Sequence, residues 1–269
     1  PLNEFRKALD NLEKARVLAV TIGDRRLESG IETWIGGMLD ILGDVSKSLD
    51  RYQRALALAR EGKWVLAEGS ALTSIGKIYT DAADWQKPLE FYSQAVTVFR
   101  SIDSKQNEAI ALNNIGIAYF SLGEQQKALD YLQQSLPLLR AAGDKNNEAI
   151  TRLNIGRIHR RLGEYDKAKD YYGQVQAIQK ETGSRPLEGE MLDEMGLGYS
   201  PEGKNVKAVE FHSQAVQIQH AVGNLRREAL ALNNLGQAYN LSAQPDKARE
   251  QFTQALSILR TIGDPSSAA

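Results

Sequence analysis

A repeat of forty residues organises this sequence. Glycine recurs at that spacing with no insertion, at Gly36, Gly76, Gly116, Gly156, Gly196 and Gly236. A mostly aromatic position follows three residues after each glycine, small residues recur twelve and nineteen residues after it, and a large residue recurs sixteen residues after it. Because residue types recur at several fixed positions in all six units, the sequence indicates an array built from one supersecondary unit.

Each unit predicts two helices. In the third unit, apolar residues follow helical spacing over 107–122 and again over 130–141. The turn Gly123-Glu124-Gln125 between them is long enough only for an antiparallel helical hairpin. Junctions such as Gly143-Asp144 suit a helix that ends on a left-handed residue and a helix that begins on a capping side chain.

The glycine inside each first helix costs about 1 kcal/mol of helix propensity relative to alanine. We therefore expect it to mark a close approach between the two helices of a hairpin. The small residue twelve positions later is the expected opposite surface, as Ala128 is for Gly116.

Composition excludes several classes of protein. The chain has 269 residues, enough for about two ordinary domains, and 42% apolar residues, which indicates a folded protein. A net charge of −1 argues against a nucleic-acid partner, and no apolar stretch approaches the length of a membrane helix. The absence of cysteine excludes disulfides and thiolate chemistry. With Pro1 first and no signal peptide visible, we expect a piece of a longer, cytoplasmic protein.

The third unit carries Leu112-x-x-Ile115-Gly116-x-x-Tyr119, followed by Ala128, Leu132 and Ser135. This pattern resembles the tetratricopeptide repeat, whose usual period is 34 residues. The forty-residue form is similar to the repeats of kinesin light chains, of the LGN/Pins spindle-orientation adaptors and of bacterial arrays that accompany CHAT protease-like domains. The resemblance implies an all-α, right-handed solenoid of antiparallel hairpins, with the first helix of each hairpin on a concave wall.

The resemblance divides the chain into the second helix of a preceding repeat at 1–23, six repeats at 24–63, 64–103, 104–143, 144–183, 184–223 and 224–263, and a tail at 264–269. The segment Ser200-Pro201-Glu202-Gly203 departs from the pattern and is expected to weaken the fifth turn. The last helix carries Phe252 and Leu256 but no polar capping helix follows it. Either the natural chain continues, or the exposed ends of the array self-associate.

No constellation for catalysis stands out. His159 and His212 occupy repeat positions that are otherwise aromatic, and no third ligand is spaced to join His212 and His220 on a metal. The sequence has no GxxxxGK and no GxSxG motif. We expect no enzyme activity, no metal and no cofactor.

The polar residues just before the repeat glycine are the candidate binding residues. In the family, the asparagine two residues before this glycine commonly lines the groove and binds the backbone of a peptide, and an amide offers both donors and an acceptor. The resemblance assigns this role to Asn114, Asn154 and Asn234. We add their polar neighbours Asn113, Asn233 and Gln237. The alternative is a polar residue on a solvated helix face.

Arg157, Arg160 and Arg161 form the strongest charge cluster on the same helix, together with Arg152. Guanidinium groups bind carboxylates with two hydrogen bonds, so an acidic peptide is a natural ligand. The alternative is that Arg157 pairs with Asp193 or Glu194 of the next first helix, with Arg160 and Arg161 remaining unpaired.

The sequence predicts a scaffold that binds a protein or peptide segment in its groove. Two alternatives stay open. The first is a regulatory array of a larger effector, such as a CHAT-type protease. The second is a self-assembling spacer.

Overall fold

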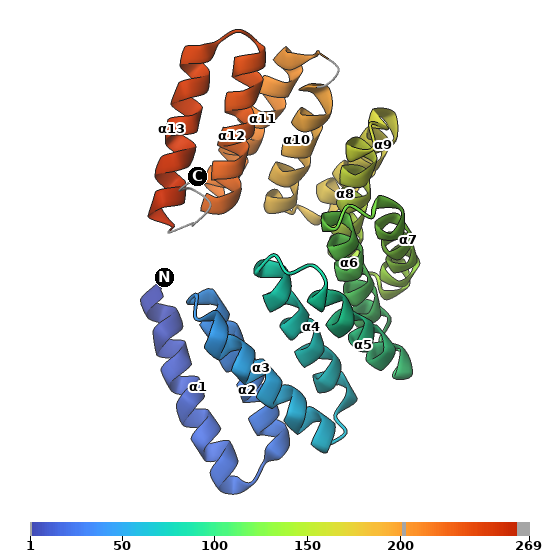
Figure 1. Cartoon of the computed structure of the whole chain (residues 1–269), viewed down its shortest axis with the longest axis vertical. Helices are drawn as coiled ribbons and strands as arrows, with labels where there is room; N and C mark the ends of the chain where they lie inside the picture. The colour runs from blue at the N-terminus through green and yellow to red at the C-terminus, as the bar shows by residue number, and fades with distance from the viewer. Residues whose placement is uncertain (1, 201–202, 263–269) are drawn as a thin grey trace. The chain divides into compact units, whose positions relative to one another are not determined.

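The computed structural model describes residues 2–200 and 203–262, and every regular element in these residues is helical (Figure 1). Pro201 and Glu202 of the fifth turn, and the 264–269 tail, lie outside the described residues. The helices are α1 (Leu2–Ile22), α2 (Arg25–Ile41), α3 (Val45–Glu61), α4 (Val65–Asp81), α5 (Lys87–Ser101), α6 (Lys105–Ser121), α7 (Gln125–Ala142), α8 (Lys145–Arg161), α9 (Tyr165–Thr182), α10 (Arg185–Tyr199), α11 (Asn205–Ala221), α12 (Leu225–Leu241) and α13 (Pro245–Thr261).

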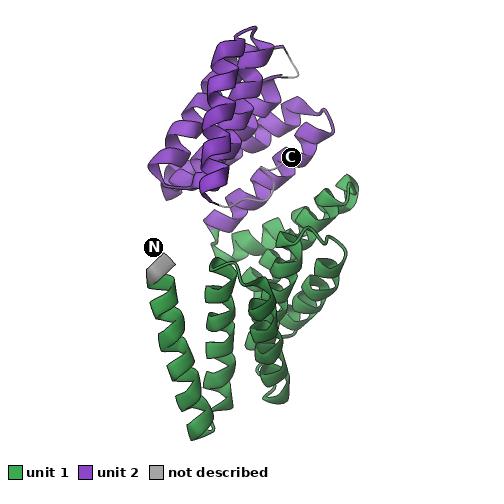
Figure 2. Cartoon of the chain, turned by 60° about the vertical axis from the view of Figure 1, so that its left-hand side comes forward, with its two compact units in different colours: residues 1–144 green, residues 145–269 purple. Residues whose placement is uncertain are grey.

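The helices group into two compact units, residues 1–144 and residues 145–269 (Figure 2). In the first unit, α1 packs on α2, and the hairpins α2–α3, α4–α5 and α6–α7 follow. In the second unit the hairpins are α8–α9, α10–α11 and α12–α13. Within each unit, every first helix packs on the second helix that follows it, and that helix packs on the next first helix. The hairpin array predicted from the repeat is confirmed in this arrangement.

The repeat glycine lies at the crossing of the two helices in a hairpin. A Cβ atom built on Gly76 would lie 2.5 Å from Cε1 of Tyr92, closer than any real contact allows. The other repeat glycines face Tyr52, Leu132, Tyr172, His212 and Phe252 in the same way. The expected opposite surface is therefore corrected: the glycine meets the large residue sixteen positions later rather than the small one twelve positions later. The small residue lies beside it, and Ser48 Oγ donates a 2.8 Å hydrogen bond to the carbonyl of Gly36.

The junctions between hairpins follow the predicted chemistry. Gly143 ends α7 in the left-handed conformation, with φ at 68°. The side chain of Asp24 accepts a 2.9 Å hydrogen bond from the backbone N–H of Leu27, which caps the start of α2. Asp103 stands at the corresponding junction before α6 with φ at 50°, so this junction accepts a residue other than glycine.

Aromatic rings stack across the ends of the hairpins. In the first unit Tyr119 stacks on Tyr131 with 5.4 Å between ring centroids. In the second unit His159 stacks on Tyr171 at 5.5 Å, so the histidine fills the aromatic position as a packed ring.

At several junctions, a glutamate in the first turn of a first helix binds an arginine in the last turn of the preceding second helix. This pairing was not predicted from the sequence. Arg60 donates to Glu68 at 2.8 Å, and Arg100 donates to Glu108 at 2.6 Å. The same glutamate position recurs in all six repeats, at Glu28, Glu68, Glu108, Glu148, Glu188 and Glu228. These bonds join consecutive hairpins at their ends.

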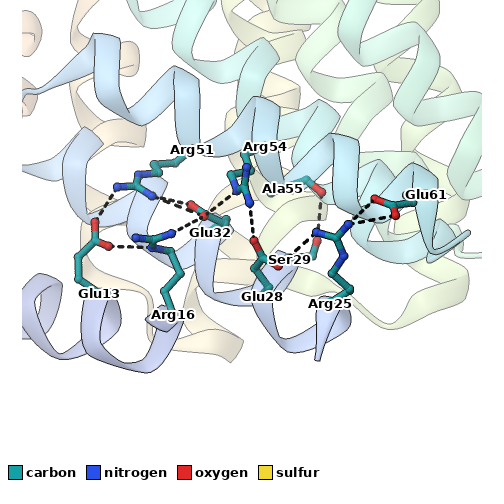
Figure 3. Close-up of polar contacts among 10 residues, drawn as sticks. All are labelled: Glu13, Arg16, Arg25, Glu28, Ser29, Glu32, Arg51, Arg54, Ala55 and Glu61. Atoms are coloured by element: carbon teal, nitrogen blue, oxygen red, sulfur yellow. Dashed lines mark hydrogen bonds and ion pairs between the residues drawn. The ribbon is translucent and has the colours of Figure 1, made fainter. Parts of the chain in front are cut away.

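The first hairpin has a denser network, which also holds α1 (Figure 3). Glu32 of α2 is fully buried, and its carboxylate lies 3.1 Å from a guanidinium nitrogen of Arg51 and 3.2 Å from one of Arg54. Arg51 also donates to Glu13 of α1 at 2.8 Å. A buried carboxylate is tolerated only when it is paired and hydrogen-bonded, and these arginines supply that compensation.

Candidate functional site

The described residues bring no group of three histidine, aspartate or glutamate side chains together that could hold a metal ion. His212 is buried, and its Nδ1 lies 2.6 Å from Oδ1 of Asp193. Asn234 Nδ2 donates to the other oxygen of Asp193 at 2.9 Å. This chain of bonds ties α10 to α11 and α12, which is a structural arrangement. None of the described helices combines the length and apolar character needed to cross a membrane.

In the first unit, the candidate residue Asn114 lies at an open hollow of about 290 Å³ between the first helices α4 and α6. Ser74 and Lys77 of α4 and Ile117 of α6 line the same hollow. In the part of the chain that the structure describes, the carboxamide of Asn114 makes no hydrogen bond. Asn113, the preceding candidate, is buried. Of these two amides, Asn114 is therefore the one presented to the hollow.

Lys77 is the cationic side chain that lines this hollow, and it forms ion pairs with two carboxylates. Its Nζ lies 3.0 Å from Asp40 of α2 and 2.5 Å from Asp81 of its own helix. Burial alone lowers the pKa of Lys77, but the hydrogen bonds and charges of Asp81 and Asp40 outweigh burial and raise the pKa above its ordinary value. The hollow therefore offers amide and hydroxyl groups and a neutralised cation.

In the second unit, the arginine cluster forms ion pairs with α10. Arg157 Nε donates to Glu194 at 2.8 Å and its Nη2 donates to Glu190 at 3.1 Å. Burial alone lowers the pKa of Arg157, but Glu194 and Glu190 raise it above its ordinary value, so the guanidinium stays charged. Asn154 accepts a 3.0 Å hydrogen bond from Arg157. In this structure Arg157 therefore pairs with acidic residues of the next first helix, which was the alternative to ligand binding.

Arg160 was expected to remain unpaired, and this expectation is wrong, because its Nε lies 3.2 Å from Glu194. The same expectation is wrong for Arg161, which is exposed in the last turn of α8 but also takes part in an interaction. Arg227 of α12 also reaches Glu190, at 3.1 Å. Glu190 and Arg227 are pairing residues that were not predicted from the sequence, although the acidic character of α10 was the signal that could have found them.

The remaining candidates lie on α12. Asn234 bonds to Asp193, as described above. Asn233 is half-buried and Gln237 is exposed, and neither side chain makes a hydrogen bond within the described residues. The three asparagines that share one repeat position thus differ in environment: Asn154 and Asn234 bind neighbouring side chains, whereas Asn114 does not.

Comparison with solved structures supports the fold. The apo form of RapI superposes with a TM-score of 0.82 at 14% sequence identity, covering 97% of this chain and 93% of that one. A Rap protein complexed with Competence and Sporulation Factor gives a TM-score of 0.77 at 15% identity, covering 97% of this chain and 72% of that one. The kinesin light chain-like repeats of Podosopora anserina give 0.54 at 20% identity, covering 72% of this chain and 95% of that one.

Sequence comparison supplies the family. No curated protein sequence matches the chain significantly. One model of the tetratricopeptide repeat matches residues 67–141 and 188–261, and a second model of the same repeat matches residues 149–182. These segments make up more than half of the chain. The chain therefore belongs to the tetratricopeptide repeat family, and its fold is an all-α repeat solenoid.

Proposed function

We propose that this protein is an interaction scaffold that binds an extended segment of a partner protein on the first helices α4 and α6. The observation that carries the proposal is Asn114, whose carboxamide faces an open hollow and makes no hydrogen bond within the described residues. An amide can donate to a carbonyl and accept from an N–H of the same extended backbone. A structurally similar Rap protein has been solved in complex with Competence and Sporulation Factor, which supports ligand binding by this fold.

The first unit suits this role better than the second. Asn154 bonds to Arg157, and Asn234 bonds to Asp193, so a ligand would have to break those bonds before binding either amide. Because Lys77 is neutralised by two aspartates, the hollow at Asn114 selects for backbone contacts rather than for acidic side chains. Binding of a peptide, without catalysis, is the function that these groups support.

An acidic segment remains a second candidate ligand for the second unit. It would bind Arg157 and Arg160 by displacing Glu194, which holds both side chains through its two carboxylate oxygens. The displaced carboxylate would then be left beside the ligand, which opposes binding. We therefore place the primary site at Asn114.

The experiment is a selection of peptides from a random library against the whole chain, followed by calorimetric titration of the selected peptides. Losing two amide hydrogen bonds costs about 1–3 kcal/mol, so Asn114→Ala is expected to weaken binding by about fivefold or more. The matched control is Gln237→Ala, which removes an exposed amide from the first helix α12. Equal affinities for the wild type and the Asn114 variant would refute the proposed site.

A further inference from the structure

One of the bonds that join consecutive hairpins is made by a histidine. The last-turn position that pairs with the first-turn glutamate recurs every forty residues, and the second helices of the six repeats hold there Arg60, Arg100, Arg140, Lys180, His220 and Arg260. Arginine and lysine side chains ordinarily stay charged at neutral pH, whereas a histidine side chain ordinarily changes its charge between about pH 5 and pH 8. The junction between α11 and α12 therefore differs from the others in the kind of charge that it uses.

The histidine bond connects the end of α11 to the start of α12. Nδ1 of His220 lies 2.9 Å from Oε1 of Glu228, which stands in the first turn of α12. The side chain of His220 is 76% exposed, so protons of the solvent reach it, whereas Glu228 is only 7% exposed. The bond thus couples a solvent-accessible titratable ring to a buried carboxylate.

The carboxylate of Glu228 is incompletely compensated. Its second oxygen, Oε2, is buried and has no hydrogen-bond partner among the described residues. At the equivalent junction of the first unit, Arg100 brings two nitrogens to Glu108, at 2.9 Å and 2.6 Å. A buried carboxylate is costly unless a cation and hydrogen bonds compensate it. Protonated His220 supplies a cation, whereas the neutral ring supplies at most a hydrogen bond.

Other charged groups on the adjoining helices are paired elsewhere. Arg227, in the first turn of α12, reaches Glu190 of α10 at 3.1 Å. On α10, which also packs on α11, Glu188 is held by Arg185 at 3.0 Å. The C-terminal end of a helix carries a partial negative charge, so the last turn of α11 also favours a cation at His220. The glutamate of α12 and the end of α11 therefore act in the same direction.

We propose that the junction between α11 and α12 is a pH-dependent joint, which is tight when His220 is protonated and looser when it is neutral. The tight junction favours the protonated ring, so its added stability is present below the titration range of histidine and is lost as the pH rises through that range. The hairpin α12–α13 is the element that loosens, because α12 attaches it to α11. This device goes beyond the proposed function, since it lies in the second unit and needs no ligand.

The test is amide hydrogen exchange of the full chain at several values between about pH 5.5 and about pH 8, expressed as protection relative to the intrinsic rate at each pH. We expect the protection of the α12 amides to fall about two- to fivefold over this range, which is the size of the effect of an exposed ion pair. The internal control is α6, whose junction uses Arg100 and Glu108. Its protection should stay constant.

Three variants separate His220 from other titrating groups. His220→Arg should keep α12 at the higher protection throughout the pH range, and His220→Gln should keep it at the lower protection, because neither new side chain titrates there. Arg100→His should give α6 the pH dependence of α12, since it creates the histidine–glutamate pair at the junction in the first unit. His159 and His212 are unchanged in these variants, so they cannot cause a difference between them.

Two results would overturn the proposal. The first is a wild-type chain in which the protection of α12 is equal at both ends of the pH range. The second is a pH dependence that persists in His220→Arg, because another group, such as His212 beside Asp193, would then be responsible. Glu228→Gln adds a separate check, since removing the carboxylate should abolish the pH dependence while the histidine stays in place. Should that variant fail to fold, His220→Arg and Arg100→His decide the question.

Discussion

Gly156 lies so close to the ring of Tyr172 that a Cβ atom on the glycine would stand 2.4 Å from Cε1 of the tyrosine. Substitution by alanine normally stabilises a helix by about 1 kcal/mol relative to glycine. At this crossing the methyl group must push the two helices of the hairpin apart, because Tyr172 is buried and cannot move aside.

We therefore predict that Gly156→Ala lowers the free energy of unfolding by about 1–3 kcal/mol, the usual cost of overpacking. The control is Gly173→Ala in the second helix of the same hairpin, where nothing lies within 4 Å of the added Cβ. That variant should gain about 0.5–1 kcal/mol. Urea denaturation followed by circular dichroism measures both, and a stabilised Gly156 variant would contradict the crossing described here.

The carboxylate of Glu194 holds both Arg157 and Arg160. Glu194→Gln keeps the size of the side chain and removes its charge, which leaves the largely buried guanidinium of Arg157 with less compensation. We expect a loss of about 1–3 kcal/mol in unfolding free energy. The same urea titration checks this, with Gln237→Ala on α12 as the surface control. An unchanged midpoint would mean that this network contributes nothing to packing of α8 on α10.

Arg100 and Glu108 form one of the bonds that join consecutive hairpins, with 2.6 Å between nitrogen and oxygen. Because the arginine is mostly exposed, screening limits the interaction. A double-mutant cycle with Arg100→Ala and Glu108→Ala should give a coupling energy of about 0.5–1 kcal/mol that falls as salt is added. A coupling that is independent of salt would argue for packing of the arginine stem instead.

Glu32 differs from Glu108 because it is fully buried and has several arginine partners. Glu32→Gln should therefore cost more, about 2–4 kcal/mol, and should loosen α1, which is tied to the same network through Glu13 and Arg51. Hydrogen exchange of the α1 amides measures the loosening. Glu61→Gln, which changes an exposed acid paired with Arg25, should shift stability by no more than about 0.5 kcal/mol.

The helices could be predicted from the sequence because their information is local. Apolar spacing over 107–122 and the turn at Gly123 define a helix that the structure places at Lys105–Ser121. The partner of each repeat glycine was predicted wrongly, because the direction in which a large side chain leaves its helix depends on its rotamer. Tyr172 reaches back over Gly156, and spacing alone favoured the smaller Ala168.

The candidate site was harder to predict than the fold. Asn114 and Asn154 are equivalent in the repeat, and only the three-dimensional surroundings separate them: Arg157 binds the second, and an open hollow faces the first. The pairing of Arg227 with Glu190 depends on which helices stack side by side, and no local pattern encodes it. The binding roles of these residues stay predictions until a partner is measured.

The carboxylates of α10 face basic groups on two sides, with Arg157 of α8 on one and Arg227 of α12 on the other. Because the hairpins have the same length and cross in the same way, their shapes alone would allow them to be exchanged. Their charges prevent such an exchange. A copy of the third hairpin in the fifth position would put Ile110 in the place of Glu190, and Arg157 and Arg227 would both lose that carboxylate. These ion pairs therefore specify which hairpin takes the fifth position, although its shape resembles that of the others.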